Sequence, residues 1–231
     1  MYNQLQERTV FEASLPFMIA AKAKAVSTGM NDHGPLHAQR VHAFVGYLSS
    51  LVALSVIERD LVLAAALLHD IGMAKGREDH HTVSANLVRK LADEKKLPFD
   101  VHEADVIATI CEWHRREYNP CEIEPERGIR TGVLASLLRL ADALDLDYRR
   151  GEDYPVQKDV ITHIYKEQEK HHLSVRDILG VRFHASRMGT DVQLLVSQME
   201  EPNLQLVRLI EELIGTPISW PVKLIVVRKQ I

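Results

Sequence analysis

The stretch LAAALLHDIGMAKG, residues 63–76, decides the fold and the chemistry expected of this chain. Its apolar residues recur at helical spacing and predict a helix with one buried face. His69 and Asp70 follow at the end of that face, with Gly72 available to terminate the helix. A buried imidazole or carboxylate must be paired, hydrogen-bonded or metal-bound, because leaving it alone in a low-dielectric core is costly. The stretch therefore predicts a helix that carries polar ligands to the protein interior.

Helical spacing of apolar residues extends on both sides of this stretch, from about residue 14 to residue 150. We expect six helices there around one shared core. The pattern then ends at a group of interrupting residues, Arg149, Arg150, Gly151 and Pro155. This change in the residue pattern predicts an all-helical domain over residues 1–150 and a separate C-terminal unit over residues 151–231.

The C-terminal unit has the pattern of a small α+β structure. Residues 181–184 and 192–196 flank a Met-Gly-Thr turn and are typical of a hairpin. Residues 203–214 are amphipathic, and residues 222–227 have the composition of a strand. The predicted fold class is therefore mainly α, an all-helical domain with a small C-terminal α+β appendage. The hairpin has edges that could pair with a second copy, so a homodimer is compatible with this fold.

Composition limits the partners and the compartment. The 231 residues are 46% hydrophobic and carry a net charge of -4, which gives no long-range attraction for nucleic acids or anionic membranes. Glu7 and Arg8 interrupt the N-terminus where a secretory signal needs an apolar stretch. Only two cysteines, Cys111 and Cys121, are present, which excludes a disulfide scaffold. We expect a cytoplasmic protein with no membrane or nucleic-acid partner.

Histidines and aspartates gather at the ends of the apolar stripes, where a side chain points inward and still reaches a cleft. His37 lies four residues before Val41 on a buried face, and Asp142 lies four residues after Leu138. Several such groups converging imply one or two divalent cations. Mixed imidazole and carboxylate ligands leave Mn, Fe, Mg, Zn and Ni open. The candidate metal ligands are His37, His69, Asp70, His80, His81, His114 and Asp142.

The order of His37, the pair His69-Asp70, and Asp142 within LLRLADALDLD resembles the H…HD…D signature of the HD superfamily, over about residues 30–150. The resemblance implies an all-helical domain that hydrolyses phosphate monoesters or diesters at one or two metal ions. It also implies that these four residues hold the first ion and that Asp70 bridges to a second where one exists. His80 and His114 would then complete the second position.

Two further resemblances refine this reading. The block HHTVSANLV is similar to one that supplies a histidine in HD-GYP cyclic-dinucleotide phosphodiesterases, with His80 as the ligand, although a slip of one residue would select His81. Trp113 and the lack of a GYP triplet depart from that family. HHTVSANLV, EWHRREYNP and LLRLADALD also resemble the C-terminal region of the exopolyphosphatase and guanosine-pentaphosphatase family. There that region accompanies an actin-like domain, which has no counterpart in these residues, so stand-alone hydrolysis is the more economical expectation.

The predicted enzyme is a metal-dependent phosphohydrolase in which a metal-activated water attacks a small phosphorylated substrate or nucleotide. The predicted catalytic residues are Asp70 together with Lys75 and Arg40, which either clamp the phosphate or remain ordinary solvated side chains. Of the adjacent Arg115 and Arg116, at most one should reach the site, because adjacent helical residues point about 100° apart. The alternative function is a non-catalytic module that binds a nucleotide or a signalling phosphate.

For the remaining polar residues we expect ordinary structural or surface roles and no part in the site. Arg149 and Arg150 would end a helix against its dipole. Asp145 and Asp147 would support the Asp142 region or face solvent. Four histidines lack apolar context and are expected at the surface; these are His163, His171, His172 and His184.

Overall fold

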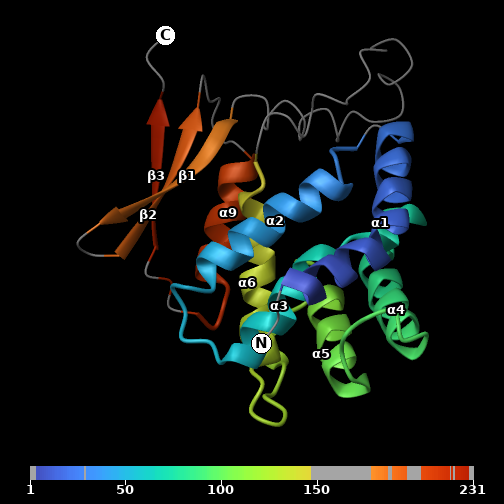
Figure 1. Ribbon diagram of the computed structural model, residues 1–231. Helices are drawn as coiled ribbons and strands as arrows, with labels where there is room; N and C mark the ends of the chain where they lie inside the picture. The colour runs from blue at the N-terminus through green and yellow to red at the C-terminus, as the bar shows by residue number, and fades with distance from the viewer. Residues whose placement is uncertain are drawn as a thin grey trace.

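The computed structural model describes residues 4–28, 30–146, 178–186, 189–196, 204–218, 220 and 222–228. Within residues 4–146 it contains six α-helices and two short 3-10 helices, which confirms the predicted helical class (Figure 1). In chain order these are α1 (Gln4–Ser27), α2 (Pro35–Leu48), α3 (Val56–Leu68), η1 (Ile71–Ala74), α4 (His80–Asp93), α5 (Val101–Glu112), η2 (Pro120–Glu122) and α6 (Thr131–Leu144).

Helix α3 is fixed at its start by a capping box. The Ser55 hydroxyl accepts the Glu58 amide (3.2 Å), and the Glu58 carboxylate accepts the Ser55 amide (2.8 Å). Glu58 is 1% exposed and also accepts from the Arg130 guanidinium, which lies at the start of α6. Burial would raise the pKa of Glu58, but the hydrogen bonds from Arg130 and from the Ser55 amide together outweigh it and lower the pKa to about 2. This ion pair, whose carboxylate is buried, therefore joins α3, which ends beside His69 and Asp70, to α6, which carries Asp142.

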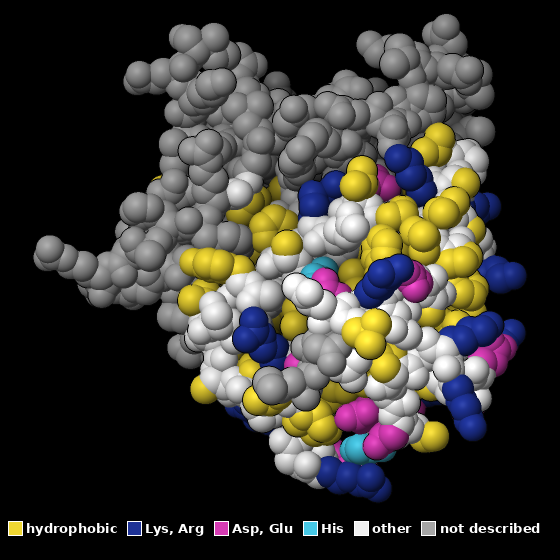
Figure 2. Space-filling view, in the orientation of Figure 1, with side chains coloured by type: hydrophobic (Ala, Val, Ile, Leu, Met, Phe, Trp, Pro, Cys, Tyr) yellow, Lys and Arg dark blue, Asp and Glu magenta, His cyan; other side chains and the backbone are white. Residues whose placement is uncertain are grey.

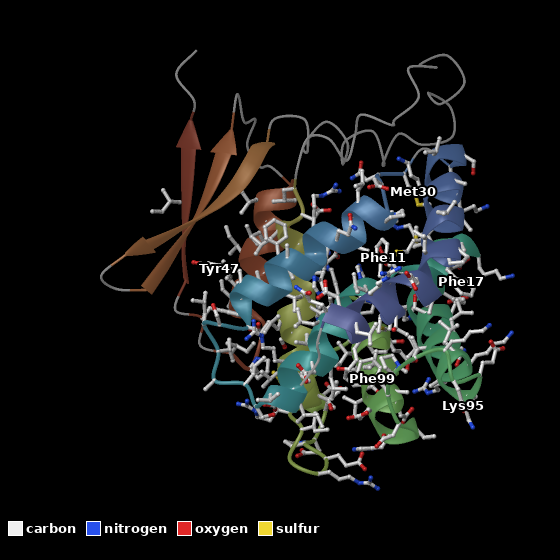
Figure 3. All side chains as sticks on the ribbon, in the orientation of Figure 1. Phe11, Phe17, Met30, Tyr47, Lys95 and Phe99 are labelled. Carbon is white, nitrogen blue, oxygen red and sulfur yellow. The ribbon has the colours of Figure 1, made fainter. Side chains whose placement is uncertain are left out.

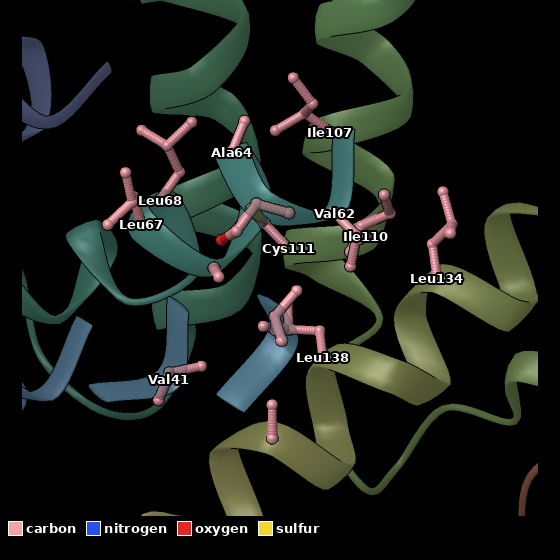
Figure 4. Packing of buried hydrophobic residues seen from close by; sticks show 14 of the residues in the cluster. Val41, Val62, Ala64, Leu67, Leu68, Ile107, Ile110, Cys111, Leu134 and Leu138 are labelled. Atoms are coloured by element: carbon pink, nitrogen blue, oxygen red, sulfur yellow. The ribbon is translucent and has the colours of Figure 1, made fainter. Parts of the chain in front are cut away.

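The core lies between α2, α3, α5 and α6. Figure 4 shows Val62 from α3, Ile107 and Ile110 from α5, and Leu134 and Leu138 from α6 directed toward one another. All five are buried. Burying a side chain of this size stabilises a fold by roughly 1.5–3 kcal/mol. This packing holds three of the helix ends that carry candidate ligands in a fixed relation.

Half-buried aromatic rings cover the edge of this core. Phe11 and Phe17 from α1 and Phe99 from the α4–α5 connection pack against it (Figure 3). On the face shown in Figure 2, Lys and Arg side chains alternate with Asp, Glu and hydrophobic side chains. Within the part of the chain that the structure describes, this face carries no extended basic surface. None of the described helices is both long enough and apolar enough to cross a membrane.

Gly72 has a different role from the predicted one. Helix α3 ends at Leu68, and Gly72 lies inside η1 without a positive φ, so it does not cap the helix in a left-handed conformation. A Cβ at this position would lie 2.1 Å from the His80 carbonyl oxygen and 2.6 Å from the Ser84 amide nitrogen. Its own amide donates to the Ser84 hydroxyl (2.9 Å). Gly72 is therefore required for close approach of η1 to the start of α4.

The C-terminal elements confirm the predicted α+β appendage. β1 (Ile178–Ser186) and β2 (Gly189–Val196) form an antiparallel hairpin, β2 pairs in parallel with β3 (Val222–Arg228), and α9 (Leu204–Ile214) packs against α6. Figure 1 shows α9 next to α6, with the sheet beyond it.

An ion pair joins α9 to α6. The Arg139 guanidinium donates to both carboxylate oxygens of Glu212 (2.9 and 3.1 Å), and the two residues are 8% and 4% exposed. Such a buried, bidentate pair fixes the rotation of α9 about its axis.

Several predictions fall outside the described residues. The domain boundary at residue 150 stays a prediction, because residues 147–177 are not described. The same applies to Asp147, Arg149, Arg150, His163, His171 and His172. His184 lies in β1, but its side chain is outside the described set.

Candidate metal centre

The first ligand group consists of His37, His69 and Asp142, which come from α2, the residue after α3, and α6. The Nε2 atoms of His37 and His69 lie 3.2 Å apart, and His37 Nε2 lies 3.5 Å from Asp142 Oδ1. Both histidines have no exposed surface, and Asp142 is 8% exposed. Residues that are 32 and 105 positions apart in sequence therefore meet at a single buried point.

The second ligand group consists of Asp70, His80 and His114. Nε2 of His80 lies 3.2 Å from Nε2 of His114 and 3.3 Å from Asp70 Oδ1. His80 is the first residue of α4, and His114 lies in the turn that follows α5. All three residues are between 5% and 7% exposed. The second group is thus buried almost as deeply as the first.

Asp70 lies between the two groups and faces both. Its Oδ2 atom lies 3.3 Å from His37 Nε2 and 3.4 Å from His69 Nε2, whereas its Oδ1 atom lies 3.3 Å from His80 Nε2 and 3.6 Å from His114 Nε2. A carboxylate that offers one oxygen to each group has the arrangement of a bridging ligand.

Each histidine is oriented through its other ring nitrogen. Nδ1 donates to a backbone carbonyl in three of them: from His69 to Ala66 (3.0 Å), from His80 to Arg77 (2.6 Å) and from His114 to Cys111 (2.5 Å). A carbonyl oxygen can only accept, so the proton sits on Nδ1 and, in the neutral ring, Nε2 carries a bare lone pair. This is the tautomer that a metal ligand requires.

The donor set fits a divalent cation. Lone pairs from His80 and His114 face each other at 3.2 Å without a proton between them, which is repulsive unless a positive charge lies between them. Two imidazoles bound to one ion at about 2.1 Å would have nitrogens roughly 3.0–3.4 Å apart. Both histidine pairs have this separation. The coarse prediction of a buried His/Asp cluster that could hold metal is confirmed.

Electrostatics favours the ligand forms of these side chains. Burial would raise the pKa of Asp70, but the charges of His69 and His33 outweigh it and hold the pKa well below its usual range. Burial, followed by the charges of His80 and His69, lowers the pKa of His114 to about 3. Asp70 is therefore anionic and His114 neutral at neutral pH.

Asp145 supports the first group from behind. It is 1% exposed and accepts a hydrogen bond from His37 Nδ1 (2.6 Å) and two from the Arg40 guanidinium (2.6 and 3.1 Å). A carboxylate behind a histidine ligand fixes the ring orientation and raises its basicity. Asp145 was expected either to support the Asp142 region or to face solvent. It is buried and supports the site, but through His37 and not through Asp142.

The two predicted phosphate clamps lie elsewhere. The Arg40 guanidinium is directed to Asp145, and its Nη2 lies 3.6 Å from Asp32. Lys75 is exposed at the end of η1. Neither residue lines the pocket above the ligands. Their phosphate-binding role stays a prediction that this placement does not favour.

A pocket of about 370 Å³ opens above the second ligand group, within the range of small-ligand sites. Asp70, His80 and His114 form part of its lining, and so does Asp142. Four arginines surround them, namely Arg77, Arg115, Arg116 and Arg208. Neither His37 nor His69 lines it.

Both Arg115 and Arg116 reach this pocket, which corrects the expectation that at most one would. The expectation assumed helical residues about 100° apart. Helix α5 ends at Glu112, and the two arginines lie in the turn that follows, where that angular rule does not apply.

His80 and His81 are separated by the structure. His80 Nε2 faces the second group, whereas His81 is directed to the Tyr118 hydroxyl (3.1 Å) and belongs to neither ligand group. His33 was missed: its Nδ1 lies 2.7 Å from Asp70 Oδ2, and with His37 and Asp70 it forms a further group of potential ligands. His33 lies before α2 begins at Pro35, so helical spacing from His37 could not have predicted its position.

Residues 27–216 match the model of the protein family described as HD-CE. The match covers well over half of the chain, contains every ligand residue from His33 to Asp142 and reaches α9. No curated protein matches the chain. The resemblance to the HD superfamily is confirmed by this match, whereas the resemblance to the exopolyphosphatase family stays a prediction.

Proposed function

This chain belongs to the HD-CE family, and from that premise we propose that it is a metal-dependent phosphohydrolase acting on a small phosphorylated compound or nucleotide. The observation that carries the proposal is the convergence of four imidazole Nε2 atoms on the two oxygens of Asp70, beneath a pocket lined by arginines. Metal ligands and anion-binding side chains thus meet in one cavity.

In this proposal the first group and the second group, joined by Asp70, hold one cation each. Bound divalent cations make water a nucleophile near neutral pH and neutralise charge on a phosphate. Asp70 would help to hold both cations, because its Oδ2 faces the first group and its Oδ1 faces the second. His37, backed by Asp145, and His69, held by the Ala66 carbonyl, keep their ring planes fixed. Asp142 faces the first group and also lines the pocket, so it lies between the metal site and the substrate.

The substrate phosphate would lie in the pocket above the second group. Arg77 lines this pocket and can donate paired hydrogen bonds to phosphate oxygens. Arg115 also lines it, but its guanidinium pairs with Glu117, which is the first cause of its raised pKa. In this arrangement Arg77, in the turn before α4, takes the role first expected of Arg40 and Lys75.

The alternative is a non-catalytic module that binds a nucleotide or a signalling phosphate. One observation favours it: the Arg208 guanidinium donates to Asp142 Oδ2 at 2.6 Å and so occupies part of a candidate ligand. A chain that kept this contact permanently would bind anions in the pocket without a complete first group.

An assay with Mn²⁺ separates the two functions. Purified protein is tested against aryl phosphate monoesters and diesters, beside His69→Ala, Asp70→Ala and the control Arg89→Ala, whose side chain pairs with Asp105 on the surface. We expect turnover by the wild type and the control and none by the two ligand variants. Phosphate binding without turnover by the wild type would favour the module.

A further inference from the structure

The C-terminal helix α9 contributes a side chain to the candidate active site. Arg208 lies on α9, 66 residues after Asp142, and its Nη2 atom lies 2.6 Å from Asp142 Oδ2. Val207 and Glu211 from the same helix also line the pocket. The buried Arg139–Glu212 pair holds α9 in this position. Part of the pocket lining is therefore supplied by a segment outside the predicted helical domain.

Two arginines of the pocket lining have no acidic partner left in that lining once Asp70 and Asp142 are assigned to the cations. Four arginines line it, against the four acids Asp70, Asp142, Glu117 and Glu211. Asp70 and Asp142 belong to the metal ligands. Glu117 pairs with Arg115, and Glu211 lies 3.5 Å from Arg116. Arg77 and Arg208 remain.

The charge of Arg208 acts on Arg77 across the pocket lining. Desolvation, followed by the charges of Arg115 and Arg208, lowers the pKa of Arg77. Burial would likewise lower the pKa of Arg208, but Asp142 outweighs it and raises that pKa. Once Asp142 is assigned to a cation, both guanidinium groups favour an anion beside them, and together they match two negative charges.

We propose that Arg208 binds the phosphate group of the substrate together with Arg77, and that this group is the dianionic phosphate of a monoester. The proposal rests on the proposed function. A phosphodiester carries one negative charge and would leave one of the two guanidinium groups unmatched. In this proposal Arg208 and a cation compete for the Asp142 carboxylate. When the cation binds Asp142, the Arg208 guanidinium is free to turn toward the pocket and bind the phosphate.

This competition for Asp142 predicts how Arg208 affects the affinity for the cation. Because Arg208 and a cation compete for Asp142, removal of the guanidinium should leave cation affinity equal or higher, while phosphate affinity falls. A purely structural role for Arg208, as a contact that docks α9 on α6, would lower both affinities together. The two roles therefore predict opposite signs for the metal.

Isothermal titration with Mn²⁺, and then of Mn²⁺-loaded protein with inorganic phosphate, tests this. We compare the full-length wild type with Arg208→Gln, Arg208→Lys and the surface control Arg89→Gln. Losing a charged, paired hydrogen bond weakens binding roughly tenfold to a hundredfold. We expect that loss of phosphate affinity in Arg208→Gln, a smaller loss in Arg208→Lys and no change in Arg89→Gln. Mn²⁺ affinity should be equal or raised in Arg208→Gln.

Dimethyl phosphate serves as the monoanionic probe. It should bind the wild type more weakly than inorganic phosphate and should lose less affinity in Arg208→Gln. Equal phosphate affinity in wild type and Arg208→Gln would overturn the proposal, and so would a joint loss of Mn²⁺ and phosphate binding with unchanged helicity. If Arg208→Gln does not fold, Arg208→Lys decides, since it keeps the charge and loses the paired geometry.

Failure of the two proposals can be told apart. A wild type that binds phosphate through Arg208 but hydrolyses no ester would refute the proposed function and leave the inference about Arg208 intact. A wild type that hydrolyses esters with no dependence on Arg208 would do the reverse.

Discussion

His37 and His69 have no exposed surface and lie outside the pocket, whereas His80 and His114 are 5% and 6% exposed and line it. The first pair comes from α2 and the end of α3, inside the packed core. The second pair comes from the start of α4 and the turn after α5, and backbone carbonyls hold both of its rings. Asp70 is the one ligand that faces both pairs.

This difference indicates a division of labour in the proposed enzyme. The two histidines of the first group are closed off by protein, and His37 is backed by the buried Asp145, so the cation of this group should be held tightly and exchange slowly. The second group faces the cavity in which the substrate would lie, so its cation should exchange faster and contact the substrate. The experiments below either separate the two groups or remove what they share.

The largest effect is expected from Asp70→Asn, because one substitution removes the carboxylate common to both groups. Neutral amide oxygens are weaker ligands, and four imidazoles would lose their anionic partner. We expect loss of both cations and a fall in kcat of at least about a thousandfold, comparable to losing an essential catalytic group. Elemental analysis and ester hydrolysis measure this. Asp105→Asn, at an exposed ion pair, is the control, and an Asp70→Asn protein with full metal content would refute the bridging role.

His69→Ala and His114→Ala separate the groups. His114→Ala should keep one tightly bound cation per chain, because the first group remains complete. His69→Ala should lose that tight cation and should also be less stable, since it removes a fully buried side chain from the end of α3. Metal titration combined with thermal unfolding tests the difference. If the two variants lost the same cation, the two groups would not be independent sites.

Gly72→Ala perturbs the contact between η1 and α4, and through His80 it acts mainly on the second group. The added Cβ would lie 2.1 Å from the His80 carbonyl oxygen, so α4 must move and carry His80 away from Asp70. Overpacking of this kind costs about 1–3 kcal/mol of folding stability. Urea unfolding and metal titration should show this cost together with weaker binding of the second cation. Gly46→Ala is the matched control, since its Cβ meets only a Leu63 methyl group at 3.9 Å and should be tolerated.

The pH dependence of the metal-free protein tests the burial of the second group. The pKa of His114 is about 3 when folded, against 6.5 unperturbed, so the unfolded chain takes up the proton first. Stability is therefore lost as pH falls below about 6.5. From about pH 6.5 to 4.5, metal-free wild type should lose about 2 kcal/mol more unfolding free energy than His114→Gln. Parallel urea titrations at both pH values measure it, and equal losses would contradict the assignment.

The smallest effect is expected from His81→Ala. Its ring is directed to Tyr118 and away from both groups, so metal content should be unchanged and activity should vary within about twofold. His80→Ala in the same assays should lose the second cation. The opposite pattern would mean that α4 begins one residue later than the structure places it.

Periodicity and the H…HD…D pattern were sufficient to predict the helical class and the first group. His37, His69 and Asp142 each lie on or directly follow an apolar stripe, so their inward direction could be read from spacing. The hairpin, α9 and β3 were likewise predicted from alternation and amphipathic spacing. These features depend on the local spacing of apolar residues, which can be recognised in the sequence without knowledge of the fold.

What the sequence did not predict depends on contacts between distant segments. Arg208 meets Asp142 across 66 residues, and Arg40 is drawn to Asp145 across 105, which no local pattern records. Gly72 matters through the close approach of η1 to α4 and not through its backbone conformation. In these cases tertiary packing decided the outcome. Arg115 and Arg116 differ, because both reach the pocket as a result of the end of α5 at Glu112, which is local structure.

The central claim is that two divalent cations lie on either side of Asp70. Anomalous X-ray diffraction from crystals of the Mn²⁺-loaded protein tests it most directly. We expect two peaks, one beside Nε2 of His37 and His69 and one beside Nε2 of His80 and His114. Peaks only at surface carboxylates, or none within coordination distance of these four nitrogens, would contradict it.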